Sequence, residues 1–234
     1  MARPRGARRR ADAVRRRLAA AYPGDAAELC ALDHDGPFQL LVATILSAQC
    51  TDVRVNEVTP TLFDRYPTAL ALAEADPEVV EEIVRPTGFY RAKTRSLVGM
   101  ARAVEERFHG TVPGDMDALT SLPGVGRKTA NVVRSVALGL PGLPVDTHVG
   151  RLARRLRLTT EADPVKVEAD LGYLVPAGER GAFSLRLILH GRAVCRARRA
   201  MCEACVLADV CPSAPAGVVL GDHREPSEQV RQKT

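Results

Sequence analysis

The residues best suited to chemistry lie in one glycine-rich segment, residues 122–131, which reads LPGVGRKTAN. Lys128 follows the two glycines Gly124 and Gly126, and Asp146 lies eighteen residues downstream in the sequence VDTH. Arginine keeps its proton in proteins, whereas lysine can lose its proton when it is desolvated or crowded by other cations. A neutral amine is a nucleophile that can form a Schiff base with a carbonyl-level carbon. Lys128 is therefore a candidate nucleophile, and simple contact with a phosphate is the alternative.

Lysine is rare in this chain, which makes its presence in this segment informative. Of the 33 basic residues, only four are lysines, at positions 93, 128, 166 and 233. Because arginine is the usual cation here, a lysine beside these two glycines indicates a role that arginine would not fulfil.

The elements that must position Lys128 are two helices joined by a tight hairpin. A short helix is expected from Met116 to about Ser121, with Asp115 as its N-cap, and Pro123 would stop it. Two glycines allow the chain to reverse, and a second helix is expected from Arg127 to about Leu138. The backbone N–H groups at the start of that helix would form a site for an anion such as a DNA phosphate. A plain connection between two helices explains the same pattern equally well. Asp146 is in turn the expected N-cap of a helix that begins near His148.

The composition predicts an all-α protein with a real hydrophobic core. Of the 234 residues, 46% are hydrophobic and only 4% aromatic, and helical periods recur where alternating strands are missing. Other helices are expected at residues 15–22, 77–84, 91–108, 148–157, 164–174 and 181–193, and at the apolar stripe around residues 38–46. Pro67, Pro77 and Pro164 each suit the first position of a helix, with Asp76 and Asp163 as N-caps for the latter two. No apolar run approaches the roughly 18–20 residues that span a bilayer, and the N-terminus lacks an apolar signal core. We therefore expect a cytoplasmic protein without a membrane partner.

The positive charge is concentrated at the N-terminus. The net charge of the chain is +5, but residues 1–17 contain eight arginines and one aspartate, so they carry +7 and the remainder carries −2. Such an arm is expected to attract polyanions such as DNA, or else simply to aid solubility. At the other end, residues 216–234 are polar and charged and are expected to form a loose tail.

Four cysteines near the C-terminus have a spacing typical of a metal site. Cys195, Cys202, Cys205 and Cys211 are separated by six, two and five residues. Disulfides are improbable in a cytosolic chain, and from ligand softness alone both zinc and an iron–sulfur cluster are admissible. Arginines 196, 198 and 199 lie between the first two ligands and are candidate phosphate contacts, or else a solvated run of charge.

The run LPGVGRKTANVV…VDTH resembles the helix–hairpin–helix DNA glycosylases, and specifically the endonuclease III family. The cysteine spacing matches the [4Fe–4S] loop of that family, so the resemblance extends over about residues 30–213 and implies a [4Fe–4S] cluster with a structural role. It also implies that Lys128 attacks the sugar C1′ and that Asp146 assists, either as a base or by stabilising positive charge.

The same resemblance assigns DNA contacts to residues that periodicity alone would place in turns or in the core. Gln49, in the LSAQ-x-TD segment, would enter the space left by an extruded nucleotide. Phe89 would be an apolar wedge between bases, although leucine is the more familiar residue at that position. His148 would hold a phosphate or orient Asp146. The equally good alternative is that it is a histidine on the helix surface with neither role. The full set of expected DNA contacts is Gln49, Phe89, Gly124, Gly126, Arg127, His148, Arg196, Arg198 and Arg199.

The implied architecture has two helical domains with a DNA cleft between them. Residues 30–140 would form a six-helix bundle containing the helix–hairpin–helix, and residues 1–29 with 141–234 a discontinuous iron–sulfur cluster domain. The implied activity is that of a monomeric, nucleoid-associated DNA glycosylase and abasic-site lyase, acting on oxidised pyrimidines and abasic sites in double-stranded DNA. A monofunctional relative of the adenine-glycosylase type is the nearest alternative, but Lys128 and the short tail argue against it. A non-catalytic DNA-binding module is the alternative from another class.

Overall fold

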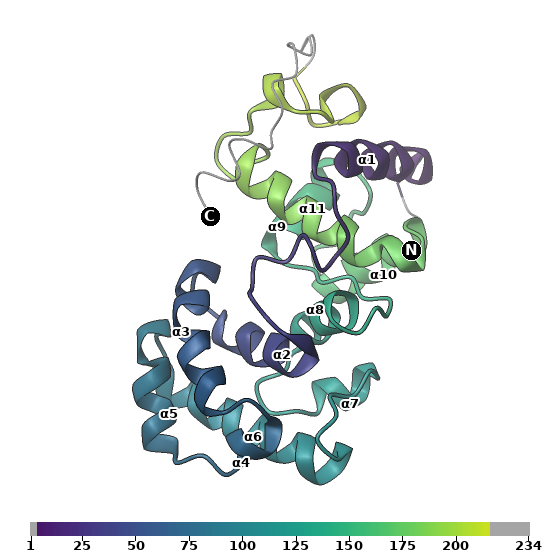
Figure 1. The fold of residues 1–234 in the computed structure, drawn as a ribbon. Helices are drawn as coiled ribbons and strands as arrows, with labels where there is room; N and C mark the ends of the chain where they lie inside the picture. Colours follow the sequence, from purple (N-terminus) through teal and green to yellow (C-terminus); the bar gives the residue numbers. More distant parts are fainter. Residues whose placement is uncertain (1–3, 216–234) are drawn as a thin grey trace. The chain divides into compact units, whose positions relative to one another are not determined.

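The structure is a computed structural model, in which residues 4–215 are described (Figure 1). Every regular element in this range is helical, and the one pairing of extended backbone is an isolated antiparallel bridge between Cys195 and Ala200. The all-α fold class is therefore confirmed. Across the same range, no helix is both long enough and apolar enough to pass through a bilayer. The expected tail, residues 216–234, lies outside the described residues.

The chain divides into two compact units. The first unit comprises Met1–Leu29 and Pro141–Thr234, and the second comprises Cys30–Leu140. The described helices of the first unit are α1 (Ala7–Ala21), α9 (Thr147–Arg155), α10 (Pro164–Leu174) and α11 (Arg180–Ala193), with 3₁₀ turns at Ala177–Glu179, Cys202–Ala204 and Ala208–Val210. The helices of the second unit are α2 (Gly36–Leu46), α3 (Asp52–Arg65), α4 (Ala69–Ala73), α5 (Pro77–Val84), α6 (Tyr90–Phe108), α7 (Met116–Thr120) and α8 (Arg127–Val136), with a 3₁₀ turn at Arg85–Thr87.

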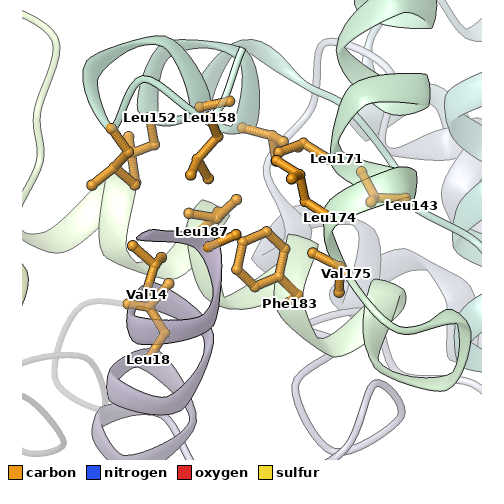
Figure 2. Packing of buried hydrophobic residues seen from close by; sticks show 14 of the residues in the cluster. Val14, Leu18, Leu143, Leu152, Leu158, Leu171, Leu174, Val175, Phe183 and Leu187 are labelled. Carbon is orange, nitrogen blue, oxygen red and sulfur yellow. The ribbon is translucent and has the colours of Figure 1, made fainter. Parts of the chain in front are cut away.

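The core of the first unit is built around α11. This helix packs against α9 and α1, and Phe183 from its first turns is completely buried (Figure 2). Figure 2 shows aliphatic side chains from α1, α9 and α10 around the Phe183 ring, among them Leu18, Leu152 and Leu171. Each such side chain contributes about 1.5–3 kcal/mol when it is removed from water. The N-terminal helix is thus part of the core that the C-terminal half of the chain forms.

The N-terminal helix begins earlier than the sequence analysis expected. Helix α1 starts at Ala7, eight residues before Arg15, because the arginine-rich stretch also carries an apolar stripe. The buried members of this stripe are Ala7, Ala11, Val14 and Leu18, at the three- and four-residue spacing of one helix face. Alanine has a high helix propensity but adds little hydrophobicity, so the dense arginines concealed the pattern.

Consequently, residues 7–17 are not a free basic arm. Arg10 donates to the backbone oxygen of Leu156 at 2.6 Å, and Arg15 forms an ion pair with Glu179 at 2.7 Å. Arg17 pairs with Asp209, and its hydrogen bond lowers the pKa of that carboxyl below the ordinary value. These arginines fasten α1 to the rest of its unit, so less of their charge is available for polyanions than expected.

The second unit is organised around α6, which packs against α4 and α5 and also contacts α2. The expected N-cap of α5 is present, because the Asp76 side chain accepts a hydrogen bond from the backbone N–H of Glu78. The expectation that Pro67 begins a helix is wrong: Thr68 is the N-cap, and α4 starts one residue later at Ala69. Helix α3 was not expected, because Pro60 lies inside it and a proline usually interrupts a helical pattern.

Candidate functional site

The predicted hairpin is present between α7 and α8. Asp115 caps α7 by accepting hydrogen bonds from the backbone N–H groups of Asp117 and Ala118, both at 2.9 Å. The turn closes through a hydrogen bond of 3.1 Å from the Val125 N–H to the Leu122 oxygen, and both of these side chains are buried. The hairpin is therefore anchored by two buried apolar side chains, one on each side of Gly124.

The two glycines of the hairpin differ in backbone conformation and in the space around them. Gly124 has a φ of 76°, in the left-handed region that other residues avoid. A Cβ atom there would also lie 2.7 Å from the Cβ of Ser96 on α6, so the turn approaches α6 too closely for any side chain. Gly126 has an ordinary extended backbone, with φ −89° and ψ 171°. The expectation that Gly126 also supplies a special backbone angle is thus wrong.

We expect Gly124→Ala to lower stability substantially. Left-handed backbone costs an alanine about 1–2 kcal/mol, and the contact with Ser96 adds to this cost, so thermal denaturation should show a fall in Tm of about 4 °C or more. Gly126→Ala is the matched control, because no atom lies within 4 Å of the Cβ that it would add. A Tm for Gly124→Ala equal to that of Gly126→Ala would contradict this account of the turn.

The start of α8 is open to a ligand. Gly126 is the N-cap residue and offers no side chain that could hydrogen-bond to the helix terminus. Arg127 and Lys128, the first two residues of α8, are both exposed. Backbone N–H groups at such a terminus, together with the positive end of the helix dipole, attract anions. The free protein leaves the side chain of Lys128 exposed, so any desolvation of this side chain has to come from a bound partner.

The predicted carboxylate, Asp146, belongs to the first unit, whereas Lys128 belongs to the second. Asp146 is the N-cap of α9, and its Oδ1 accepts a hydrogen bond of 2.8 Å from the backbone N–H of Val149. The side chain is half-buried. One oxygen of the carboxylate is thus held by the helix terminus, and the expected capping role is observed.

His148, in the first turn of α9, is held by its own unit. Its Nδ1 lies 3.1 Å from Nη2 of Arg151, and a Cβ on Gly191 of α11 would lie 2.9 Å from the same nitrogen. Burial lowers the pKa of His148, and the charges of Arg151 and Arg192 act in the same direction, whereas Asp146 opposes them. The imidazole is therefore held mostly neutral, with its Nδ1 side occupied by protein.

Gln49 and Phe89 are alike in their exposure and in their backbone conformation. Both are exposed, Phe89 to 66%, although a phenylalanine is ordinarily buried. Both also adopt left-handed backbone, with φ of 55° at Gln49 and 48° at Phe89, which is uncommon for residues other than glycine. Strained backbone of this kind is concentrated at functional sites, so both turns qualify as parts of a binding surface.

The surroundings of Phe89 contain charges that the sequence analysis did not single out. Arg85 and Arg91 both lie over the ring of Tyr90, at 5.3 and 5.6 Å from its centroid. Their spacing around the segment Gly88-Phe89-Tyr90 was visible in the sequence, but the stacking on one ring was not. An exposed aromatic side chain next to two cations suits a surface that contacts nucleic acid.

The four cysteines of the predicted metal site lie at the end of the first unit. Burial, and to a smaller extent the charges of Cys195, Cys211 and Cys202, raise the pKa of Cys205 to about 11, so the four thiols are near one another. Among the described residues, no group of three or more His, Cys, Asp or Glu side chains is arranged to hold a single metal ion. A four-iron cluster does not need such convergence, because each thiolate binds a different iron.

The loop between the first two cysteines is held by Arg155 of α9. Its guanidinium donates to Sγ of Cys195 at 3.2 Å, and to the backbone oxygens of Arg196 and Ala197 at 2.8 and 2.9 Å. The side chains of arginines 196, 198 and 199 are all exposed. Protein contacts alone therefore already hold part of the loop that presents these cations to solvent.

Comparisons with known proteins agree with this arrangement. Residues 42–177 match the family described as HhH-GPD superfamily base excision DNA repair protein. The chain is 54% identical to endonuclease III of Synechocystis sp. over 83% of its length and 88% of that protein. It is 41% identical to endonuclease III of Escherichia coli, over 77% of this chain and 85% of that protein. Among solved structures, a trapped endonuclease III–DNA covalent intermediate superposes with a TM-score of 0.81 and 39% identity, over 88% of this chain and 96% of that chain.

Proposed function

The chain belongs to the HhH-GPD superfamily of base excision DNA repair proteins and, within it, to the endonuclease III family, and we propose that it removes oxidised pyrimidines from double-stranded DNA through a Schiff base on Lys128. As a member of this family, it is a DNA glycosylase with abasic-site lyase activity. The observation that supports the assignment of the nucleophile is the position of Lys128, exposed in the first turn of α8 beside an uncapped helix terminus.

Binding of the DNA backbone at this terminus would place the lysine beside a sugar. The N–H groups at the start of α8 can bind a phosphate oxygen without reading any base, and Gly126 leaves room for its approach. Arg127 adds a positive charge at the same place. The exposed arginines 196, 198 and 199 are proposed as further phosphate contacts of the first unit, and His148 as a neutral donor through its Nε2.

The proposed chemistry takes place in two stages. First, Nζ of Lys128 bonds to C1′ while the C1′–N1 bond breaks, and the departing base keeps the electron pair and takes up a proton. The C1′–O4′ bond then opens, O4′ gains a proton, and loss of a proton from the nitrogen leaves a Schiff base between C1′ and Nζ. In the second stage a proton leaves C2′, and the C3′–O bond breaks with departure of the 3′ phosphate.

Asp146 is proposed to act on this reaction with the carboxylate oxygen that does not cap α9. It would either take the proton of the attacking amine or stabilise the positive charge that develops on the sugar. The cap hydrogen bond to Val149 fixes the direction of the carboxylate, so no large reorganisation is needed when charge develops.

The sugar of a stacked nucleotide is out of reach, so the target must be extruded from the helix. We propose that Phe89 inserts between neighbouring bases and that Gln49 fills the space that the nucleotide leaves. Insertion of an apolar side chain offsets an unstacking cost of a few kcal/mol. The exposure of both side chains supports this role, since neither has to leave a core in order to reach DNA.

The proposal is tested by borohydride trapping, which reduces a Schiff base to a stable amine. Incubation of the protein with a duplex containing thymine glycol and sodium borohydride should give a covalent protein–DNA adduct. The two alternatives predict otherwise: a monofunctional glycosylase releases the base without an adduct, and a binding module does neither. Absence of both adduct and strand cleavage would refute the assigned reaction.

For the cofactor, we propose that Cys195, Cys202, Cys205 and Cys211 hold a [4Fe–4S] cluster. All four donors are thiols of one short segment, and soft thiolates are the ligands of such clusters. The cluster would fix the loop that carries arginines 196, 198 and 199 and leave the reaction to Lys128. Purified protein is expected to absorb visible light and to contain about four irons per chain. A colourless protein with zinc alone would contradict this prediction.

The remaining properties are proposed from the substrate. A protein that acts on chromosomal lesions is expected in the cytoplasm at the nucleoid, where it would meet damaged and abasic DNA. We propose that it acts as a monomer, because each proposed contact with DNA comes from this one chain.

A further inference from the structure

Lys93 is a buried lysine that the proposed reaction does not use. It lies in the first turn of α6, is only 5% exposed, and forms no ion pair within the part of the chain that the structure describes. Lysines are almost never fully buried without a partner, because removing the ammonium group from water is costly. Its burial thus requires an explanation beyond core packing.

The amine of Lys93 joins two separate turns of the second unit. Nζ donates one hydrogen bond to the backbone oxygen of Leu46 and another to that of Thr87, both at 2.8 Å. Leu46 is the last residue of α2, whose final carbonyl groups have no partner inside the helix. Thr87 is the last residue of the 3₁₀ turn before Gly88. One side chain therefore satisfies the ends of two elements that lie 41 positions apart in the sequence.

Each of these turns carries one of the proposed DNA-inserting residues. Gln49 follows Leu46 by three residues, and Phe89 follows Thr87 by two. The backbone of Lys93 is bound to the second turn as well, because its N–H donates to the oxygen of Phe89 at 3.1 Å. Both residues have left-handed backbone, which persists only where the surrounding structure holds it. Lys93 supplies contacts of this kind to both turns at once.

We propose that Lys93 is a positioning residue that holds the Gln49 turn and the Phe89 turn in fixed relation, so that both side chains enter the DNA together. This inference rests on the proposed function of Gln49 and Phe89. Wedging apart the bases and filling the vacated space are two parts of one event, so the spacing of the two turns matters. If Lys93 acted only by filling space in the core, its hydrogen bonds would not affect the spacing of the two turns.

The test uses Lys93→Met, which keeps the length and apolar stem of the side chain and removes its donors. Excision of thymine glycol from an intact duplex under single-turnover conditions is expected to slow about tenfold, because extrusion of a paired nucleotide requires both insertions. Cleavage of a duplex with a preformed abasic site should change by less than about threefold, since an abasic nucleotide is much easier to extrude. Fluorescence of 2-aminopurine opposite the lesion should report less unstacking in the variant complex.

Two control variants separate positioning from general loss of stability. Val98→Ala removes buried volume from the same helix, five residues beyond Lys93, and Lys166→Met removes an exposed lysine from α10. Both should keep the wild-type ratio of excision to abasic-site cleavage, even where Val98→Ala lowers the Tm as much as Lys93→Met does. If Lys93→Met does not fold, Lys93→Leu replaces it, because leucine is also apolar and has no donor, and the same selective loss of excision is expected.

The outcomes distinguish this inference from the proposed function. If wild-type protein cleaves both substrates and Lys93→Met loses both activities equally, or neither, the positioning role is wrong and the proposed function stands. The same holds if the ratio falls equally in Val98→Ala, or if neither Lys93 variant folds, since Lys93 would then be structural. If wild-type protein itself forms no adduct with DNA, the proposed function fails first.

Discussion

Replacement of Lys128 by alanine is expected to abolish covalent trapping on DNA and to lower strand cleavage by at least about 10³-fold, a loss in the range seen when a nucleophile is removed. Without Nζ no bond to C1′ can form, so no Schiff base exists for borohydride to reduce. The variant should fold normally, because the side chain is exposed and packs into no core. Gel analysis after borohydride treatment, together with single-turnover cleavage assays, provides the measurement.

Lys128→Arg separates the charge of this residue from its chemistry. Arginine retains a cation at the start of α8 but cannot lose its proton, so it should bind DNA nearly as well as the wild type and still fail to trap it. Lys166→Ala controls for the loss of a lysine elsewhere and should trap normally. Strong adduct formation by Lys128→Ala would assign the nucleophile to another amine.

Local sequence signals predicted the hairpin and several helix boundaries well. Caps such as Asp115 and Asp163 act on N–H groups two or three residues away, so their effect is encoded in the adjacent sequence. The turn at Gly124 is equally local in its backbone angle. The close approach of Gly124 to Ser96 is not local, because it depends on where α6 packs.

The features that sequence reasoning missed depend on tertiary contacts. The early start of α1 follows from the burial of small alanines against α10 and α11, which arginine density conceals. The left-handed backbone at Gln49 and Phe89 has no signature in either residue type, since glycine is the residue that normally marks such angles. Lys93 was recognised as one of four lysines, but its two carbonyl partners lie 47 and 6 positions away along the chain. Sequence spacing could not reveal that pairing.

Asp146→Asn is expected to slow DNA cleavage by about 10²–10⁴-fold while the fold remains unchanged. Asparagine is as good an N-cap as aspartate, and its Oδ1 can still accept the hydrogen bond from Val149, so the Tm should shift by no more than about 2 °C. The matched control is Asp163→Asn, which makes the same change at the N-cap of α10, where Oδ1 accepts from Lys166 N–H at 3.0 Å.

The pH dependence of Asp146→Asn then distinguishes the two proposed roles of the carboxylate. If Asp146 takes the proton of the amine, alkaline pH should restore much of the lost rate, because hydroxide in solution can then remove that proton. If it stabilises positive charge on the sugar, the deficit should persist at every pH, since asparagine carries no charge at any of them. Wild-type cleavage rates in Asp146→Asn at neutral pH, with Asp163→Asn equally active, would remove Asp146 from the reaction altogether.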